Sequence, residues 1–337
     1  MTKKPSNPHD AYARQILSRA ADAASEIRAN IDADLAARID FDGMVLVPGS
    51  FITEDLRSQY SDVLYRTTID DRGAYLYILI EHQSCNDQLM AFRMLSYVVN
   101  IWRRHLDEHP VPQVLPVVVP MVVHSTHTGL RWTAPTQLGD LIDLDGSARD
   151  LLDRYLPRFE FLLDDVAPLD VAALRARELT PAARLMLIMH KIGPGNPHLG
   201  SDIMEVVDEL RALLDGPSGT REFDILVTYL FIVCDVSVTE LQPLTDSLGP
   251  RAKEVVMTTA ERLEARGEAR GEARGEARGE ARGRAAGRAE ILLEQLTVKF
   301  GPLPNAVTQR VQAAGAEDLH VWARRVLTAD SLADVFA

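Results

Sequence analysis

The chain has 337 residues and a formal net charge of −13 at pH 7, with 46% hydrophobic and 25% charged residues. This composition excludes a wholly disordered or collagen-like chain, and the length is typical of about two domains. The acidic balance argues against a surface that attracts nucleic acid through its overall field, although it is compatible with a local cationic groove.

The sequence predicts a cytoplasmic protein without a membrane span. Its cysteines, Cys85 and Cys234, are too few for a disulfide framework or a cysteine-based zinc site, which favours a reducing compartment. Residues 1–10 are polar and lack the apolar segment of a secretion signal. The longest apolar run, residues 114–123, is interrupted by prolines and is half as long as the roughly 20 residues that a membrane helix needs.

Hydrophobic spacing predicts alternating helices and strands in the first 240 residues, followed by helices. A weak amphipathic helix is expected at 9–30, a long helix at 85–108 and interrupted helices over 179–234. Runs of β-prone or apolar residues predict strands at 41–48, 63–69, 75–80, 115–123 and 159–166. This order indicates an α/β or α+β core with an all-α continuation.

A low-complexity segment, residues 262–290, repeats Glu-Ala-Arg-Gly from Glu264 onward. Its six glycines cost a helix about 1 kcal/mol each against alanine, and the four-residue period puts like charges at i,i+4. Glycine at every fourth residue also allows two helices to approach closely. We expect either a solvated, partly helical spacer or a helix-pairing segment over 250–290, and a small helical interaction module at 291–337.

The residues with the most chemistry lie on a predicted β-hairpin whose turn is centred on Asp71 and Arg72. In the register that follows, Asp62 lies directly opposite Glu81 on a neighbouring strand. Gln83, two residues beyond Glu81, shares that face if the strand continues. The hairpin therefore predicts a cluster of carboxylate and amide oxygens at one end of two largely apolar strands.

Two carboxylates and an amide oxygen are hard ligands suited to Mg²⁺ or Mn²⁺. A bound metal can orient and deprotonate a water molecule and stabilise charge on a scissile phosphate. Alternatively, Asp62 and Glu81 are solvated or pair with Arg57, Arg66 or Arg93. The spacing alone leaves both interpretations open.

Segments along this region resemble the Rpn (YhgA-like) family of recombination-promoting nucleases and transposases. The resemblance rests on Ser61-Asp62-Val63-Leu64-Tyr65, on the Glu-His-Gln-Ser motif at 81–84 and on residues 90–97, and it extends over roughly residues 9–240. It implies a PD-(D/E)XK nuclease fold, in which helices flank a central mixed sheet. The first 240 residues would then form the nuclease domain with its helical extension.

The resemblance further implies that Asp62 and Glu81 are metal ligands. Gln83 stands where most such nucleases have lysine. Because glutamine carries no charge, it can orient a water molecule or a phosphate only through hydrogen bonds. The opening His9-Asp10 also resembles the family, but the residues that follow it depart from the family pattern.

The expected function is that of a Mg²⁺-dependent DNA endonuclease of low sequence specificity that promotes recombination. The same metal cluster would also support strand transfer by a transposase, and a third possibility is a catalytically weak DNA-binding or oligomeric scaffold. Candidate phosphate contacts are Arg93, Arg103 and Arg104, although Arg93 could pair with an acid and the other two lie where a helix C-terminus favours positive charge. The expected partners are DNA and a second copy of the chain.

Other polar residues receive weaker expectations. His82 is expected on the opposite face from Glu81, as a hydrogen-bonded residue. The pair Asp164-Asp165 ends a predicted strand and is a further acidic candidate near the site. His124 and His127 are expected to frame a turn without binding metal.

Overall fold

A computed structural model describes residues 8–47, 61–81, 87–109, 114–126, 128–144, 146–234 and 236–337. At residues 61, 62 and 79–81 the backbone alone is described. The chain divides into two compact units, residues 1–260 and 261–337.

The first unit is built on a five-stranded sheet with the order β1-β2-β3-β4-β5. The strands are β1 (Val45–Leu46), β2 (Ser61–Ile69), β3 (Arg72–Glu81), β4 (Val117–His124) and β5 (Leu162–Asp165). The first two strand pairs are antiparallel and the last two are parallel, so the sheet is mixed. This confirms the α/β class that the sequence predicts.

Helices precede the sheet, cross between its parallel strands and follow it. Those of the first unit are α1 (Pro8–Leu17), α2 (Ala20–Arg28), α3 (Ala33–Ala36), α4 (Met90–Glu108), α5 (Gly146–Leu152), α6 (Val171–Arg175), α7 (Pro181–Ile192), α8 (Leu199–Asp202), α9 (Val207–Asp215), α10 (Gly219–Val233) and α11 (Gln242–Leu248). The division between the units falls within α12 (Pro250–Phe300), which is followed by α13 (Asn305–Gln312), α14 (Ala316–Arg325) and α15 (Leu332–Phe336). In the described part of the chain, no helix is both long and apolar enough to cross a bilayer.

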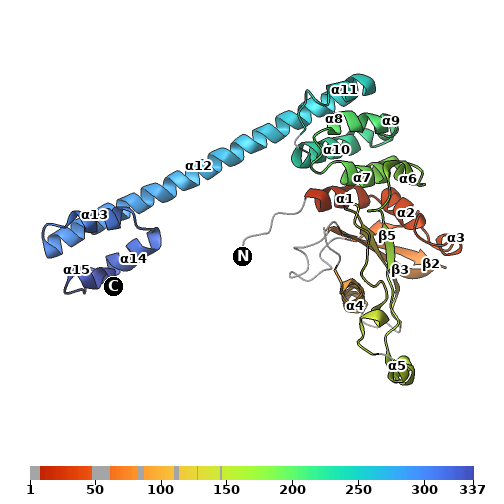
Figure 1. Cartoon of the computed structure of the whole chain (residues 1–337), viewed down its shortest axis with the longest axis horizontal. Coiled ribbons are helices and arrows are strands. Elements are labelled where there is room, and N and C mark those ends of the chain that lie inside the picture. Colours follow the sequence, from red (N-terminus) through yellow and green to blue (C-terminus); the bar gives the residue numbers. More distant parts are fainter. Residues whose placement is uncertain are drawn as a thin grey trace. The chain divides into compact units, whose positions relative to one another are not determined.

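Successive side chains of β2 and β3 point to opposite faces of the sheet, and both faces are buried. Val63, Tyr65 and Ile78 join one core with α1, α2 and α7, whereas Leu64 and Tyr77 join a second core with α4. Figure 1 shows these helices on opposite sides of the strands. The sequence predicts from the unbroken apolar run of β3 that this strand is covered on both faces, and the structure confirms it.

The hairpin between β2 and β3 turns one residue earlier than expected. Its turn residues, Asp70 and Asp71, both have positive φ, 47° and 61°, a conformation that aspartate tolerates better than most residues. Asp62 consequently pairs with Leu79, so its predicted pairing directly opposite Glu81 is wrong. Because the register moves by two residues and side chains alternate with a period of two, positions 62 and 81 still share one face.

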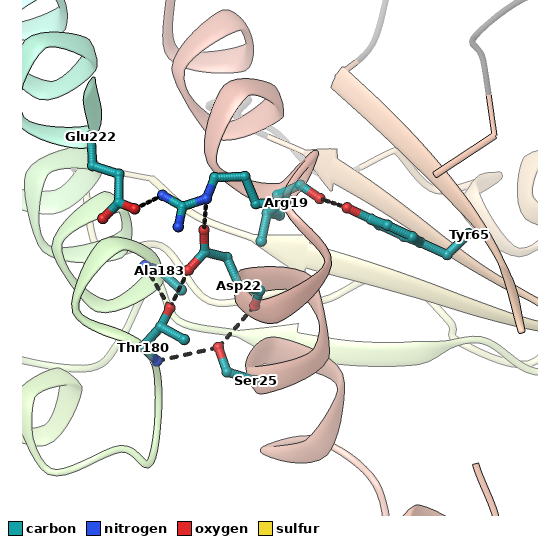
Figure 2. Close-up of polar contacts among 8 residues, drawn as sticks. Arg19, Asp22, Ser25, Tyr65, Thr180, Ala183 and Glu222 are labelled. Carbon is teal, nitrogen blue, oxygen red and sulfur yellow. Dashed lines mark hydrogen bonds and ion pairs between the residues drawn. The ribbon is translucent and has the colours of Figure 1, made fainter. Parts of the chain in front are cut away.

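A buried polar network attaches the α1–α2 corner to the helices around it (Figure 2). Arg19 pairs with Asp22 at 3.3 Å and also with Glu222 of α10. On its other side, Asp22 accepts a hydrogen bond of 2.5 Å from the hydroxyl of Thr180, which caps α7. The Tyr65 hydroxyl donates at 2.7 Å to the last carbonyl of α1. These contacts fix α1 and α2 against the sheet, α7 and α10.

In the second unit, the end of α12 packs against α13, α14 and α15. The fully buried residues of this core include Leu292, Leu296, Val311, Leu319 and Val335. The Glu-Ala-Arg-Gly repeat lies within α12, and its glycines from 267 to 287 are surrounded by open space, since a Cβ at any of them would meet no atom within 4 Å. Packing inside one described chain therefore does not account for the glycines.

Candidate active site

The parallel strands β3, β4 and β5 end together at one edge of the sheet. Their last residues are Glu81, His124 and Asp165, and the register pairs Glu81 with His124 and His124 with Asp165. All three positions follow, by even steps, residues that pack on the α4 face, such as Tyr77 and Val122. The carboxyl ends of parallel strands are the usual place for a site in α/β proteins.

Position 62 belongs to the same group. It pairs with Leu79, so Glu81 is its diagonal neighbour, and such neighbours lie about 7–8 Å apart. Among the described side chains, no group of three or more His, Cys, Asp or Glu could hold a metal ion. The side chains of Asp62 and Glu81 are not part of that set, and Gln83 lies outside the described residues. His82, His127 and Arg57 lie outside them too.

His124 is held in place by Asp165. The ring is 1% exposed, and its Nδ1 lies 2.8 Å from Oδ1 of Asp165. The other carboxylate oxygen accepts a hydrogen bond of 3.0 Å from the backbone N–H of Trp132, whose ring meets the imidazole edge to face at 5.2 Å. Because a carboxylate only accepts hydrogen bonds, Nδ1 carries a hydrogen, which leaves Nε2 as the nitrogen that can carry a lone pair.

The role of His124 was not foreseen from the sequence, which suggested a turn residue. Its partner in β3 depends on a parallel pairing between residues more than 40 positions apart. The one local signal is its place directly after the buried run of β4. For Asp165, the end of a predicted strand was a correct indication of position.

The neighbouring Asp164 lies on the opposite face of β5, in a second carboxylate cluster. Its Oδ2 is 2.7 Å from Arg177, and the same guanidinium lies 3.6 Å from the fully buried Glu26 of α2. Burial raises the pKa of Glu26 well above its usual range, the hydrogen bond to Asp164 and the charge of Asp164 raise it further, and Arg177 opposes them. Two carboxyl groups therefore face one guanidinium, and the protonated form of Glu26 is favoured.

The candidate phosphate contacts lie along α4, which runs back antiparallel to β3. Arg93, near the start of α4, pairs with Asp87 and lies 3.4 Å from the hydroxyl of Tyr97. Arg104, in the last turns, pairs with Glu108 at 2.8 Å, and Arg103 beside it is exposed. The helix therefore separates Arg93 from the other two arginines.

His9 and Asp10 lie at the start of α1, on the face of the sheet opposite to α4. The His9 ring is 2.8 Å from the hydroxyl of Tyr229 and packs against His190. Burial raises the pKa of Asp10 to about 6. The end of α7 approaches the residues after β5, because Lys191 donates to the carbonyl of Ala167 at 3.0 Å. The contacts of the His9 ring with Tyr229 and His190 give it a packing role between α1, α7 and α10.

The mixed sheet with helices on both faces is consistent with a PD-(D/E)XK-type fold. The model of the family described as "Putative transposase, YhgA-like" matches residues 7–222. The chain therefore belongs to this family, which confirms the resemblance seen in the sequence.

Named relatives match most of the chain. Recombination-promoting nuclease RpnA of Escherichia coli (strain K12) is 32% identical over 268 residues, 79% of this chain and 86% of that protein. Recombination-promoting nuclease RpnD of Escherichia coli O157:H7 is 30% identical over 263 residues, 77% and 94% of the two chains. The inactive recombination-promoting nuclease-like protein RpnE of strain K12 is 30% identical over 265 residues, 78% and 83%. No solved structure matches the chain.

The raised pKa of Glu26 predicts a specific dependence of stability on pH. A carboxyl group whose folded pKa is raised stabilises the fold fully below its unfolded pKa, near 4.5, and loses that contribution as the pH rises through the folded pKa. Glu26→Gln keeps a donor toward Asp164 and cannot ionise. We expect the free energy of unfolding of the natural chain to fall relative to this variant from pH 5 to pH 8, by at most about 1.4 kcal/mol per pH unit.

Urea unfolding at several pH values measures the difference between the two chains. The exposed Glu205 supplies the matched control, since Glu205→Gln should leave the natural pH dependence in place. Parallel pH profiles for the natural chain and Glu26→Gln would contradict the proton assignment.

Proposed function

We propose that this protein is a cytoplasmic, Mg²⁺- or Mn²⁺-dependent DNA endonuclease of low sequence specificity that promotes recombination. The observation that carries the proposal is the arrangement of positions 62 and 81 on one face of the sheet, beside His124, where the parallel strands end. The names of two of the relatives, recombination-promoting nucleases, support the same activity.

In this proposal the carboxylates of Asp62 and Glu81 hold the metal ion. Hard oxygen donors suit Mg²⁺ and Mn²⁺, which keep several water molecules and bind phosphate oxygens, so the donor set fits the ion. When bound, the ion supplies positive charge for the scissile phosphate and lowers the pKa of a coordinated water. Gln83 orients the attacking water or the phosphate by hydrogen bonds.

His124 supplies the proton acceptor that an uncharged Gln83 lacks. Its Nδ1 hydrogen is donated to Asp165, so in this proposal the lone pair of Nε2 takes the proton. A water oxygen forms its bond to phosphorus while Nε2 takes the water proton. The P–O bond to the leaving strand then breaks, and the leaving oxygen takes a proton from solvent. Asp165 stabilises the imidazolium that results.

DNA would contact the protein along α4. Arg93 lies near the strand ends and must exchange Asp87 for a phosphate. Arg103 and Arg104 lie at the other end of this 19-residue helix, which is about 28 Å long. They contact phosphates in this proposal only if the duplex lies along the helix.

Removing one metal ligand tests the site. We expect Asp62→Asn and Glu81→Gln each to slow Mg²⁺-dependent nicking of supercoiled plasmid by about a hundredfold or more, because each loses a charged oxygen from the ion. Nicking is measured with Mg²⁺, with Mn²⁺ and with EDTA. Glu205→Gln, at an exposed position, is the matched control. Full activity in a cleanly purified, folded Asp62→Asn protein would refute the site.

The Asp165–His124 pair gives a second, independent prediction. In Asp165→Asn the side-chain amide would donate to Nδ1, so the hydrogen of the ring moves to Nε2 and the proton acceptor is lost. We expect nicking to slow by about 10²- to 10⁴-fold, with the Mg²⁺ concentration for half-maximal rate unchanged. Asp164→Asn, on the other face of β5, should leave the rate near that of the natural chain. Equal rates for the two variants would exclude His124 as the acceptor.

Two other functions predict different products. A transposase would join a labelled donor end to a second DNA, whereas the nuclease leaves only nicked or cut DNA. A scaffold would bind DNA without cutting it under any metal, and the inactive relative at 30% identity is the reason to include that outcome.

We also propose that the repeat pairs with the repeat of a second copy, aided by the helical module at 291–337. From Glu264 to Arg278, no glutamate or arginine has an opposite charge three or four residues away on its own helix, and like charges recur at i,i+4. The side chains of this stretch are exposed. A second copy supplies the missing opposite charges.

The order of residues in the repeat also sets the orientation of the pair. At 100° per residue, any face centred on glycine has the arginine row on one flank and the glutamate row on the other. Two parallel copies then place glutamates against arginines, whereas antiparallel copies place like charges together. The proposal is therefore a parallel pair.

Charge reversal in the full chain tests this pairing. One variant changes Glu268, Glu272, Glu276 and Glu280 to Arg, and the other changes Arg270, Arg274, Arg278 and Arg282 to Glu. Each variant should sediment as a monomer, and an equal mixture should recover the dimer of the natural chain at low ionic strength, where exposed charges are least screened. If each variant dimerises alone as well as the natural chain does, the repeat is not the interface.

A further inference from the structure

We infer that Trp132 is a positioning residue, which holds the imidazole of His124 in the orientation that a proton acceptor needs. The inference rests on the role proposed for His124 in the nuclease. Trp132, in the loop after β4, contacts both members of the Asp165–His124 pair. Its backbone N–H donates to Oδ2 of Asp165 at 3.0 Å, and its indole meets the imidazole at 5.2 Å between centroids, with 71° between planes.

The two contacts restrict different movements of the pair. Asp165 accepts from His124 on Oδ1, at 2.8 Å, and from Trp132 on Oδ2, so the carboxylate cannot rotate without losing one hydrogen bond. The imidazole has one hydrogen bond to Asp165, through Nδ1, and a ring held at a single nitrogen can still tilt about that bond. The indole closes one side of the imidazole, and the direction of Nε2 therefore depends on Trp132.

The indole is itself held in place. Its Nε1–H donates to the carbonyl of Ala134 at 2.7 Å, and its ring lies 6.1 Å from that of the buried Phe161, with 83° between planes. A backbone bridge between Gln137 and Glu160 attaches the same loop to the chain before β5. Trp132 is thus a fixed wall beside the imidazole.

Trp132 has no group to offer to the reaction itself. Its one polar side-chain atom is the Nε1–H donor, which is used by Ala134. Its effect on catalysis must therefore come through the orientation of His124. Catalytic geometry is sensitive to such support, since a displacement of about 1 Å can slow a reaction about a hundredfold.

Trp102 supplies a matched control. Its indole N–H also donates to a backbone carbonyl, that of Pro116, at 2.9 Å, and its side chain is also half-buried. Pro116 directly precedes β4, so Trp102 lies at the opposite end of that strand from His124. Trp132→Ala and Trp102→Ala remove the same ring and the same kind of hydrogen bond. Both keep the backbone N–H that bonds Asp165, so the difference between them measures the indole of Trp132.

Nicking of plasmid by the full-length protein, at saturating Mg²⁺ and DNA, is the first measurement. We expect Trp132→Ala to lower kcat at least about tenfold and to leave the DNA concentration for half-maximal rate nearly unchanged. Trp132→Phe keeps an aromatic ring beside the imidazole and should recover most of the rate. Trp102→Ala should keep a kcat near that of the natural chain. If Trp132→Ala does not fold at the assay temperature, Trp132→Leu replaces it.

Nuclear magnetic resonance of the ¹⁵N-labelled full chain, without DNA or metal, is the second measurement. The signal of the hydrogen-bonded Nδ1–H of His124 is identified by its loss in His124→Gln. It should persist in Trp132→Phe and in Trp102→Ala, and it should be lost or shifted in Trp132→Ala.

The outcomes separate this inference from the proposed function. An unchanged His124 signal in Trp132→Ala, or an equal loss of kcat in Trp132→Ala and Trp102→Ala, would overturn the positioning role. A natural chain that nicks no DNA would refute the nuclease. In that case the His124 signal alone decides, and its dependence on Trp132 would support the positioning role.

Discussion

The pairing of β3 with its two neighbours is the constraint on which the rest of the structure depends. The strand is antiparallel to β2 and parallel to β4, and it is buried on both faces. Parallel pairing forces a crossover, which α4 supplies, and it brings the ends of β3, β4 and β5 to one edge. The groups proposed for catalysis come from four strands, and this pairing, together with that of β4 and β5, makes them neighbours.

The adjacent residues Asp164 and Asp165, at the end of β5, point to opposite faces of the sheet and join two different sets of charges. Asp165 holds His124 on the α4 face, while Asp164 meets Arg177 and Glu26 under the helices of the other face. The two sets share a strand but face different helices, so the Glu26 cluster does not contact the proposed proton acceptor. The chemistry of that cluster is the raised pKa of Glu26.

Local patterns were sufficient to predict the strands, the long helix and the shared face of positions 62 and 81. The exact register was not predictable in the same way, because the turn residues are the aspartates with positive φ at 70 and 71, one residue before the expected centre at Asp71 and Arg72. His124 was missed because its importance comes from pairing with Glu81 across a parallel connection, a contact that no local spacing encodes. The resemblance to the family predicted the fold, whereas the Asp165–His124 hydrogen bond could be found only in the three-dimensional structure.

The acidic character of the whole chain is consistent with a nuclease once the charge of the site is considered. The proposed site combines Asp62, Glu81 and Asp165 without a lysine, since Gln83 holds the usual lysine position, and a phosphate approaching it alone would be repelled. A divalent ion reverses the sign of the local field, so phosphate binding and water activation depend on the same ion. A lysine would supply charge without the metal. With Gln83 in its place, the proposed site would bind a phosphate only together with the ion, because the other charged groups of that site are carboxylates.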